Sequence, residues 1–117
     1  MIKTYNGSKL GITPSHKRSL LRNMSAQLFL YEKIVTTLPK AKELRSFSER
    51  LITKAKKNDL NAKKALHSQI NDKEIVKKVF EVLVPRYSAR NGGYTRIIKV
   101  GKRRGDAADT AIVQLIV

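Results

Sequence analysis

The sequence predicts an α+β fold, with helices packed on one small mixed β-sheet and an irregular basic N-terminal arm. Two observations lead to this class. Between residues 14 and 84, apolar side chains recur at helical spacing, and one short β-branched run interrupts them. After residue 93, two β-rich runs flank a turn, which is typical of a hairpin. Helices followed by a hairpin favour the α+β class, so we expect an arm over residues 1–13 and a single domain over residues 14–117.

The first helix is expected to begin at Pro14, because proline is favoured at the first helical position and Thr13 can cap the turn. Apolar side chains follow at helical spacing, and the cations of this segment lie largely off their stripe. The stripe consists of Leu20, Leu21, Met24, Leu28 and Tyr31. This helix therefore has one apolar face and one cationic face.

A short strand and a second helix come next. Residues 34–37 are all β-branched, which favours a strand. Thr37 can then cap a helix that has Pro39 in its first turn. One side of this helix is apolar, and cations crowd the rest. The apolar side holds Ala41, Leu44, Phe47 or Ser48, Leu51, Ile52 and Ala55.

Two shorter helices complete the helical part. Asn58 and Asp59 end the second helix and can cap a third. Asn71, with Glu74 three residues later, resembles a capping box, so a fourth helix is expected to start there. This helix should stop before Pro85, because a proline disfavours the helical conformation in the residue that precedes it.

The C-terminal part changes character. Residues 85–93 are expected to form a basic, flexible loop, and residues 94–100 a strand. Residues 101–106 are expected to form a turn that bears three cations. The segment 109–117 is β-rich and apolar on nearly both faces, so we expect it to lie inside the sheet rather than at its edge.

The charge of the chain points to a polyanionic partner. Lysine and arginine number 25 against 9 aspartates and glutamates, a formal net charge of +16 on 117 residues. Ordinary surfaces mix both signs, and so lopsided a charge repels itself in the compact state. Nucleic acid relieves that repulsion, because each neutralised phosphate releases counterions. A membrane surface fits less well, since no helix joins a basic face to an aromatic-rich one.

Other classes of function have little support. The chain has no cysteine, which excludes disulfides, thiol catalysis and cysteine zinc sites. His16 and His67 are far apart in the sequence and do not form a recognisable metal-binding motif. Glu43 and Glu49 lie in a lysine-rich segment predicted to be helical, where ion pairs with residues one turn away account for them. We therefore expect no catalytic residue, metal or cofactor. The N-terminus lacks the apolar core of a signal peptide, so a cytoplasmic protein is expected.

Two segments combine cations with other groups that suit RNA. In residues 85–99, arginines are interspersed with Tyr87 and Tyr94. An arginine can donate two hydrogen bonds to one phosphate, and a tyrosine can stack on a base. Gly92 and Gly93 would let backbone amides approach a phosphate. The alternative is a plain entry to a hairpin with a core tyrosine. Residues 15–18 lie in the first helical turn, where free amides favour an anion, although a capped surface helix is the alternative.

Several short runs, spread in order over nearly the whole chain, form a recognisable set. They are Ser15-His16-Lys17-Arg18, Arg22-Asn23-Met24, Thr36-Thr37-Leu38-Pro39-Lys40-Ala41-Lys42-Glu43-Leu44-Arg45, Leu51-Ile52-Thr53, Pro85-Arg86, Gly92-Gly93-Tyr94-Thr95-Arg96-Ile97 and Gly105-Asp106. This set resembles the bacterial large-subunit ribosomal protein seventeen family. Lys17 stands where the family usually has arginine. Its ammonium group is a point charge and cannot bind a phosphate through two parallel hydrogen bonds as a guanidinium does.

The resemblance implies a non-enzymatic structural constituent of the 50S ribosomal subunit. It implies binding to 23S ribosomal RNA, by electrostatic and shape recognition, near the polypeptide exit tunnel. It also implies ribosomal protein thirty-two of the same subunit as a neighbour. Two other classes remain open: a basic DNA-binding module of nucleoid type, for which no helix-turn-helix is evident, and a basic RNA-modifying enzyme, which would need a cofactor pocket.

The expected RNA contacts come from the arm, the start of the first helix, the exposed side of the second helix, and the segment from residue 86 through the hairpin. They are Lys3, Lys9, Ser15, His16, Lys17, Arg18, Arg22, Asn23, Lys40, Lys42, Arg45, Arg50, Arg86, Arg90, Gly92, Gly93, Tyr94, Arg96, Lys99, Lys102, Arg103 and Arg104.

Overall fold

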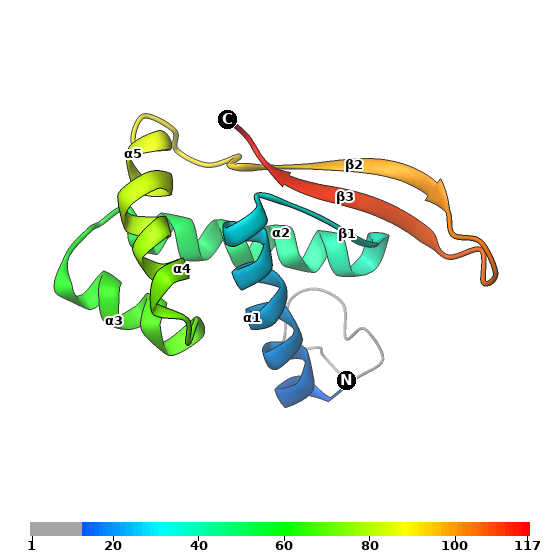
Figure 1. Ribbon diagram of the computed structural model, residues 1–117, viewed down its shortest axis with the longest axis horizontal. Helices are drawn as coiled ribbons and strands as arrows, with labels where there is room; N and C mark the ends of the chain where they lie inside the picture. Colours follow the sequence, from blue (N-terminus) through cyan, green and yellow to red (C-terminus); the bar gives the residue numbers. More distant parts are fainter. Residues whose placement is uncertain (1–12) are drawn as a thin grey trace, which may run out of the picture.

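The computed structural model describes residues 13–117, and it confirms the α+β class (Figure 1). The predicted arm lies outside the described residues except for Thr13. The elements in chain order are α1 (Pro14–Tyr31), β1 (Lys33–Thr37), α2 (Leu38–Ala55), α3 (Leu60–Gln69), α4 (Lys73–Lys78), a π-helical turn η1 (Val79–Leu83), α5 (Val84–Arg86), β2 (Thr95–Lys102) and β3 (Asp109–Leu115).

The three strands of the sheet lie in the order β1-β3-β2. The apolar strand β3 is central, as predicted, and it pairs antiparallel with both neighbours. The sheet is therefore wholly antiparallel, and the expectation of a mixed sheet was wrong. β1 and β2 do run in the same direction, but β3 separates them, so no parallel pair forms.

Helices α1 and α2 cover one face of this sheet. α2 contacts all three strands, and α1 contacts β1 and β3. Every second residue of β3 from Ala111 is buried in the core with side chains from both helices. The core includes Leu28 and Phe29 of α1, Leu44 and Ile52 of α2, and Val79 and Leu83 of η1. Figure 1 shows the far half of the β2–β3 hairpin projecting beyond the end of α2.

Two of the expected side-chain caps are present, and a third is shifted by one residue. Thr37 precedes α2 as expected, but its side chain makes no capping hydrogen bond. Thr13 Oγ1 accepts from the His16 amide at 3.3 Å, and Asp59 Oδ1 accepts from the Ala62 amide at 2.7 Å. The cap of α4 is Asp72 rather than the predicted Asn71, and its Oδ1 accepts from the Glu74 amide at 2.9 Å. A carboxylate is the stronger acceptor and also complements the positive end of the helix dipole.

Pro85 does not end the fourth helical segment, which contradicts the sequence prediction. The helical run continues from α4 through η1 to Arg86. In η1 the Val84 amide bonds to the Val79 carbonyl, five residues back, so the turn is wider than an α-turn. We attribute the presence of Pro85 inside the helical run to this wider turn. The turn gives the proline ring room beside the carbonyl of Glu81, which is an exposed residue. Among the described helices, none combines the length and apolarity that crossing a bilayer requires.

Candidate nucleic-acid interface

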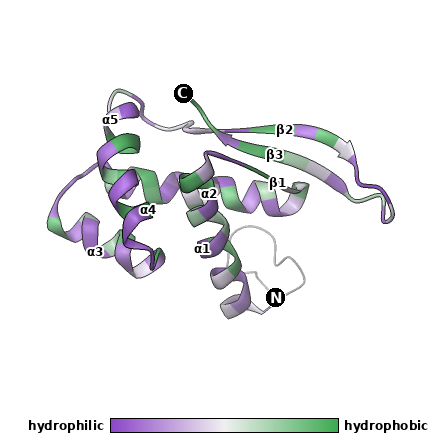
Figure 2. Ribbon diagram, in the orientation of Figure 1, coloured by the Kyte–Doolittle hydropathy of each residue, from purple (hydrophilic) through white to green (hydrophobic). Residues whose placement is uncertain are grey.

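The expected RNA-binding residues fall on three parts of the described surface: the first turns of α1, the outer side of α2, and the segment from Arg86 through the hairpin. Lys3 and Lys9 lie outside the described residues. Most of the others are exposed, and Figure 2 shows the hairpin turn as hydrophilic. The exposed set is Ser15, His16, Arg18, Asn23, Lys42, Arg45, Arg50, Arg90, Gly92, Gly93, Arg96, Lys99, Lys102, Arg103 and Arg104.

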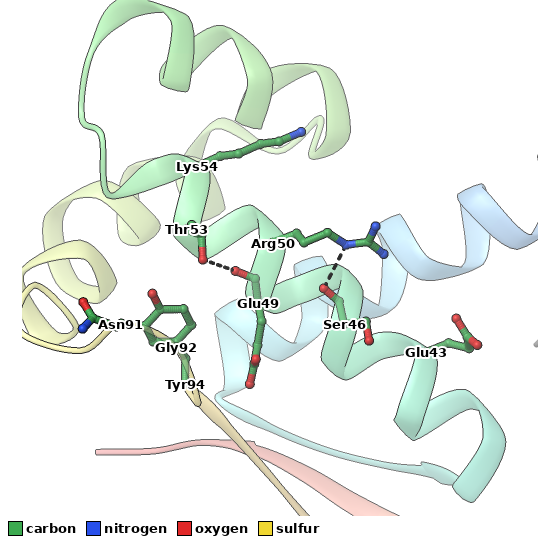
Figure 3. Close-up of a pocket in the computed structure, with 9 residues that line it drawn as sticks. All are labelled: Glu43, Ser46, Glu49, Arg50, Thr53, Lys54, Asn91, Gly92 and Tyr94. Carbon is green, nitrogen blue, oxygen red and sulfur yellow. Dashed lines mark hydrogen bonds between the residues drawn. The ribbon is translucent and has the colours of Figure 1, made fainter. Parts of the chain in front are cut away.

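A groove of about 630 Å³ runs along the outer side of α2 (Figure 3). It is lined by Glu43, Ser46, Glu49, Arg50, Thr53, Lys54, Asn91, Gly92 and Tyr94. At one end, Lys17 of α1 forms an ion pair with Glu43 at 3.5 Å. At the other end, the loop before β2 closes on α2. The groove, named the α2 groove below, therefore joins three segments that are distant in the sequence.

The two carboxylates of the α2 groove are held by protein partners. Glu43 pairs with Lys17, and Glu49 accepts from the Thr95 amide at 3.3 Å and the Thr95 hydroxyl at 2.8 Å. These partners lie on other elements, whereas the sequence had suggested pairing within the helix. Lys17 offsets the charge of Glu43, whereas the neutral Thr95 groups hold Glu49 in place without cancelling its charge.

Arg50 and Lys54 supply the positive charge of the α2 groove. They are one helical turn apart and both are exposed. Figure 3 shows the two side chains extending to the same side of α2. Arg50 Nε donates to the Ser46 carbonyl of its own helix at 3.2 Å. That contact orients the guanidinium and leaves its two terminal nitrogens for an anion.

Lys56 fixes the loop that forms one end of the α2 groove. Its Nζ donates to the Arg90 carbonyl and to the Tyr94 hydroxyl, the latter at 3.1 Å, and lies 5.3 Å from the centre of the Tyr94 ring. Arg90 Nη1 in turn donates to the Gly93 carbonyl at 3.0 Å, across a backbone that has φ 64° at Gly93. Sequence reasoning missed Lys56, because nothing distinguishes it from the other lysines of this helix.

Tyr94 is a core residue, which corresponds to the alternative reading of this segment. Its side chain is 1% exposed, and its ring centre lies 5.1 Å from that of Tyr87. Tyr87 is equally buried and donates from its hydroxyl to the Ile116 carbonyl at 2.5 Å. Neither ring face is open to a base in this structure, so the expected stacking role does not fit. The hydroxyl of Tyr94 still reaches the α2 groove.

Arg86 also has a partner within the protein. Its Nη1 donates to Glu32 Oε1 at 2.5 Å, and Lys78 Nζ donates to Glu32 Oε2 at 3.1 Å. The Arg86 hydrogen bond is the main cause that lowers the pKa of Glu32, and it likewise raises the pKa of Arg86. Sequence reasoning missed Glu32, whose φ of 64° turns the chain from α1 into β1. A non-glycine residue in that conformation leaves no sequence signal.

The remaining expected contacts are divided among several surfaces. Arg22 Nε donates to Gln69 of α3 at 2.9 Å. On the hairpin, Arg103 pairs with Asp106 at 2.5 Å, which lowers the pKa of Asp106 to about 2. Lys102 pairs with Asp109 at 3.5 Å. Arg96 lies opposite Gln114 on the sheet, on the face that α1 and α2 leave uncovered.

The histidines stay apart in the fold, with His16 on α1 and His67 on α3. Within residues 13–117, no three acidic or imidazole side chains gather as they would around a metal ion. What the structure brings together is cationic and hydrogen-bonding: α1, α2 and the loop before β2 present one basic surface.

Comparison with known proteins decides between the classes left open by the sequence. A profile of the family described as ribosomal protein L17 matches residues 20–116. The chain belongs to this family. It is 67% identical over 116 residues to the large ribosomal subunit protein bL17 of Endomicrobium trichonymphae, covering 99% of both chains. The bL17 protein of Halothermothrix orenii is 53% identical over 108 residues, covering 92% of this chain and 95% of its own.

Membership of the L17 family confirms the resemblance noted in the sequence. A third relative, bL17 of Campylobacter concisus, is 52% identical over 108 residues and covers 92% of each chain. The chain is thus a structural constituent of the large ribosomal subunit, and it acts in translation as part of the cytoplasmic ribosome. The DNA-binding module of nucleoid type is no longer a competing interpretation.

Proposed function

We propose that this L17-family chain binds 23S ribosomal RNA along the α2 groove and over the adjoining start of α1. The observation that carries the proposal is the meeting of α1, α2 and the loop before β2 along one side of α2, where Arg50 and Lys54 are exposed. Lys17 reaches α2 through Glu43, Arg50 and Lys54 lie in the middle, and Asn91 and Gly92 close the far end. RNA strands that repel one another could be held together there.

The binding is electrostatic and shape-dependent rather than base-specific. Arginine guanidinium groups and lysine ammonium groups neutralise RNA phosphates, which releases the counterions bound to the RNA. The first turn of α1 adds free backbone amides at a positive helix end, next to the exposed Ser15 and His16. The buried tyrosine pair and the Lys56 contacts hold the loop rigidly, so the α2 groove is formed before RNA arrives. The exposed hairpin cations Lys99 and Arg104 extend the contact beyond α2.

The finer location follows from the family resemblance. We place the chain near the polypeptide exit tunnel, with ribosomal protein thirty-two as a neighbour. Lysine-specific cross-linking of purified large subunits, followed by mass spectrometry, tests this placement. Cross-links from this chain to protein thirty-two are expected. Cross-links that connect it only to proteins remote from the tunnel would contradict the placement.

A matched pair of variants tests the RNA proposal. Arg50→Ala with Lys54→Ala removes two charges from the α2 groove, and Lys63→Ala with Lys64→Ala removes two exposed charges from α3. Binding to 23S RNA fragments and to duplex DNA of equal length is measured for each. We expect the first pair to weaken RNA binding and lower the salt slope by about two, and the second pair to have a smaller effect. Equal effects of both pairs, or equal affinity for DNA, would refute the proposal.

A further inference from the structure

Within residues 13–117, no helix covers the face of the sheet opposite α1 and α2, called the open face below, and this face is partly apolar. Residues alternate between this face and the core, except where the register of β2 shifts between Lys99 and Gly101. The open-face positions are Lys33, Val35 and Thr37 of β1, Arg96, Ile98 and Gly101 of β2, and Thr110, Ile112 and Gln114 of β3. Antiparallel sheets with one face in water normally carry polar residues there. Here Val35 is 65% exposed and Ile98 is 40% exposed.

The apolar residues of the open face form a continuous row. Val35 lies directly opposite Ile112, and Ile112 lies directly opposite Ile98, so the row crosses all three strands. Side chains at such positions touch one another. Val100, at the register shift of β2, is also exposed. Apolar patches of this kind on a protein surface are typical of interaction sites.

A basic row runs beside the apolar one. Lys33 lies opposite Gln114, and Gln114 lies opposite Arg96, two residues along each strand from the apolar row. None of the open-face positions of β1, β2 and β3 is a carboxylate. A partner that fits both rows presents aliphatic side chains next to an acidic group.

Other occupants match this face less well. RNA bases stack on aromatic side chains, and the open-face positions of the three strands hold none. A second copy of this chain brings a further net charge of +16. Residues 1–12 of the chain itself carry Lys3 and Lys9 but no aspartate or glutamate, so they cannot neutralise the basic row.

We propose that the open face of the sheet binds a segment of a neighbouring large-subunit protein, which packs aliphatic side chains on Val35, Ile98 and Ile112 and sets a carboxylate against Lys33 or Arg96. The apolar row supplies the desolvated centre of the contact, and the basic row fixes its direction. This contact does not depend on the RNA-binding groove, which lies along α2.

Site-specific photocross-linking identifies what lies on this face. A benzophenone amino acid replaces Ile98, and a control chain carries it at Leu60, an exposed apolar residue of α3. Large subunits containing each chain are purified, irradiated, digested and analysed by mass spectrometry. We expect the probe at position 98 to attach to a protein segment that holds aliphatic residues and an aspartate or glutamate within a few positions. Attachment to RNA, to residues 1–12, to a segment without a carboxylate, or to nothing would overturn the proposal.

A second variant keeps the inference testable without a bulky probe. Val35→Thr with Ile98→Thr removes the apolar contact but keeps two β-branched residues that suit strands. We expect this chain to leave large subunits about tenfold more readily in a salt wash, with unchanged affinity for 23S RNA fragments. Unchanged retention in the subunit would overturn the inference. An equal loss of affinity for the RNA fragments would assign the face to RNA instead.

Discussion

Glu32 Oε1 accepts a hydrogen bond from Arg86 Nη1 at 2.5 Å, although the two residues are 54 positions apart in the chain. This contact joins the end of α1 to the end of the helical run that passes Pro85. Lys78 Nζ donates to the same carboxylate at 3.1 Å and to the Leu30 carbonyl at 2.9 Å. The Glu32 cluster, meaning Glu32 with Arg86 and Lys78, thus connects the two ends of the helical part beside the sheet.

Removing the charge of Glu32 should destabilise the fold. In Glu32→Gln the two cations lose their shared carboxylate, and we expect the free energy of unfolding to fall by about 1.5 kcal/mol, the low end for hydrogen bonds between charged groups, because the side chain is partly exposed. Urea denaturation measures the change. Glu81→Gln, at an exposed position of η1, is the matched control and should stay within about 0.5 kcal/mol of the parent. Equal losses in both variants would contradict a special role for Glu32.

The contribution of Glu32 should also depend on pH. The hydrogen bond from Arg86 lowers the pKa of Glu32 below its ordinary value of 4.5. A carboxylate with a lowered folded-state pKa stabilises the protein above its unfolded-state pKa, and this stabilisation is lost as pH falls through the folded-state pKa. The stability difference between the parent and Glu32→Gln should therefore be constant near neutral pH and shrink below pH 4.5. A difference that persists undiminished in strong acid would contradict the ion pair.

A core substitution on α2 tests the packing of the helices. Leu51 is 3% exposed and belongs to the hydrophobic core. Leu51→Ala should lower the free energy of unfolding by about 2–5 kcal/mol through lost burial and a residual cavity. Leu60→Ala is the control, since Leu60 is 67% exposed at the start of α3. Its unfolding free energy should change by no more than about 0.5 kcal/mol. A similar cost at both positions would contradict the assigned core.

Lys56→Met should loosen the loop before β2 without unfolding the protein. Methionine keeps much of the aliphatic stem but cannot donate to the Arg90 carbonyl or the Tyr94 hydroxyl. We expect faster amide hydrogen exchange at Asn91, Gly92 and Gly93, with the exchange of β3 unchanged. If the loop amides exchange as in the parent, the Lys56 contacts do not hold the loop.

The elements of the fold could be predicted from local chemistry where that chemistry is strong. Thr13 and Pro14 fixed the start of α1, and Asp59 fixed the cap of α3, because proline and side-chain acceptors act within one helical turn. The central place of β3 followed from its apolar character on both faces. Pro85 was misread because a local rule cannot anticipate the π-helical turn in front of it.

The composition predicted that the surface would be basic, but it did not predict how the basic residues are arranged on the fold. Each cation of α1 and α2 was visible in the sequence, whereas the ion pair of Lys17 with Glu43 and the clamp of Lys56 on the loop join distant positions. Tyr94 and Arg86 were expected at RNA, and the structure gives each a partner inside the protein. Such long-range contacts depend on the tertiary packing, which a single sequence does not display.

The dissociation constant for a 23S RNA fragment, measured as a function of salt concentration, tests the central claim most directly. The tightest-binding fragment from a set that covers the RNA is titrated with the chain at several ionic strengths. If about six phosphates are neutralised, affinity should fall on the order of 10³-fold between 50 and 200 mM salt. An affinity that does not change with salt, or that is no tighter than the affinity for duplex DNA, would contradict the account.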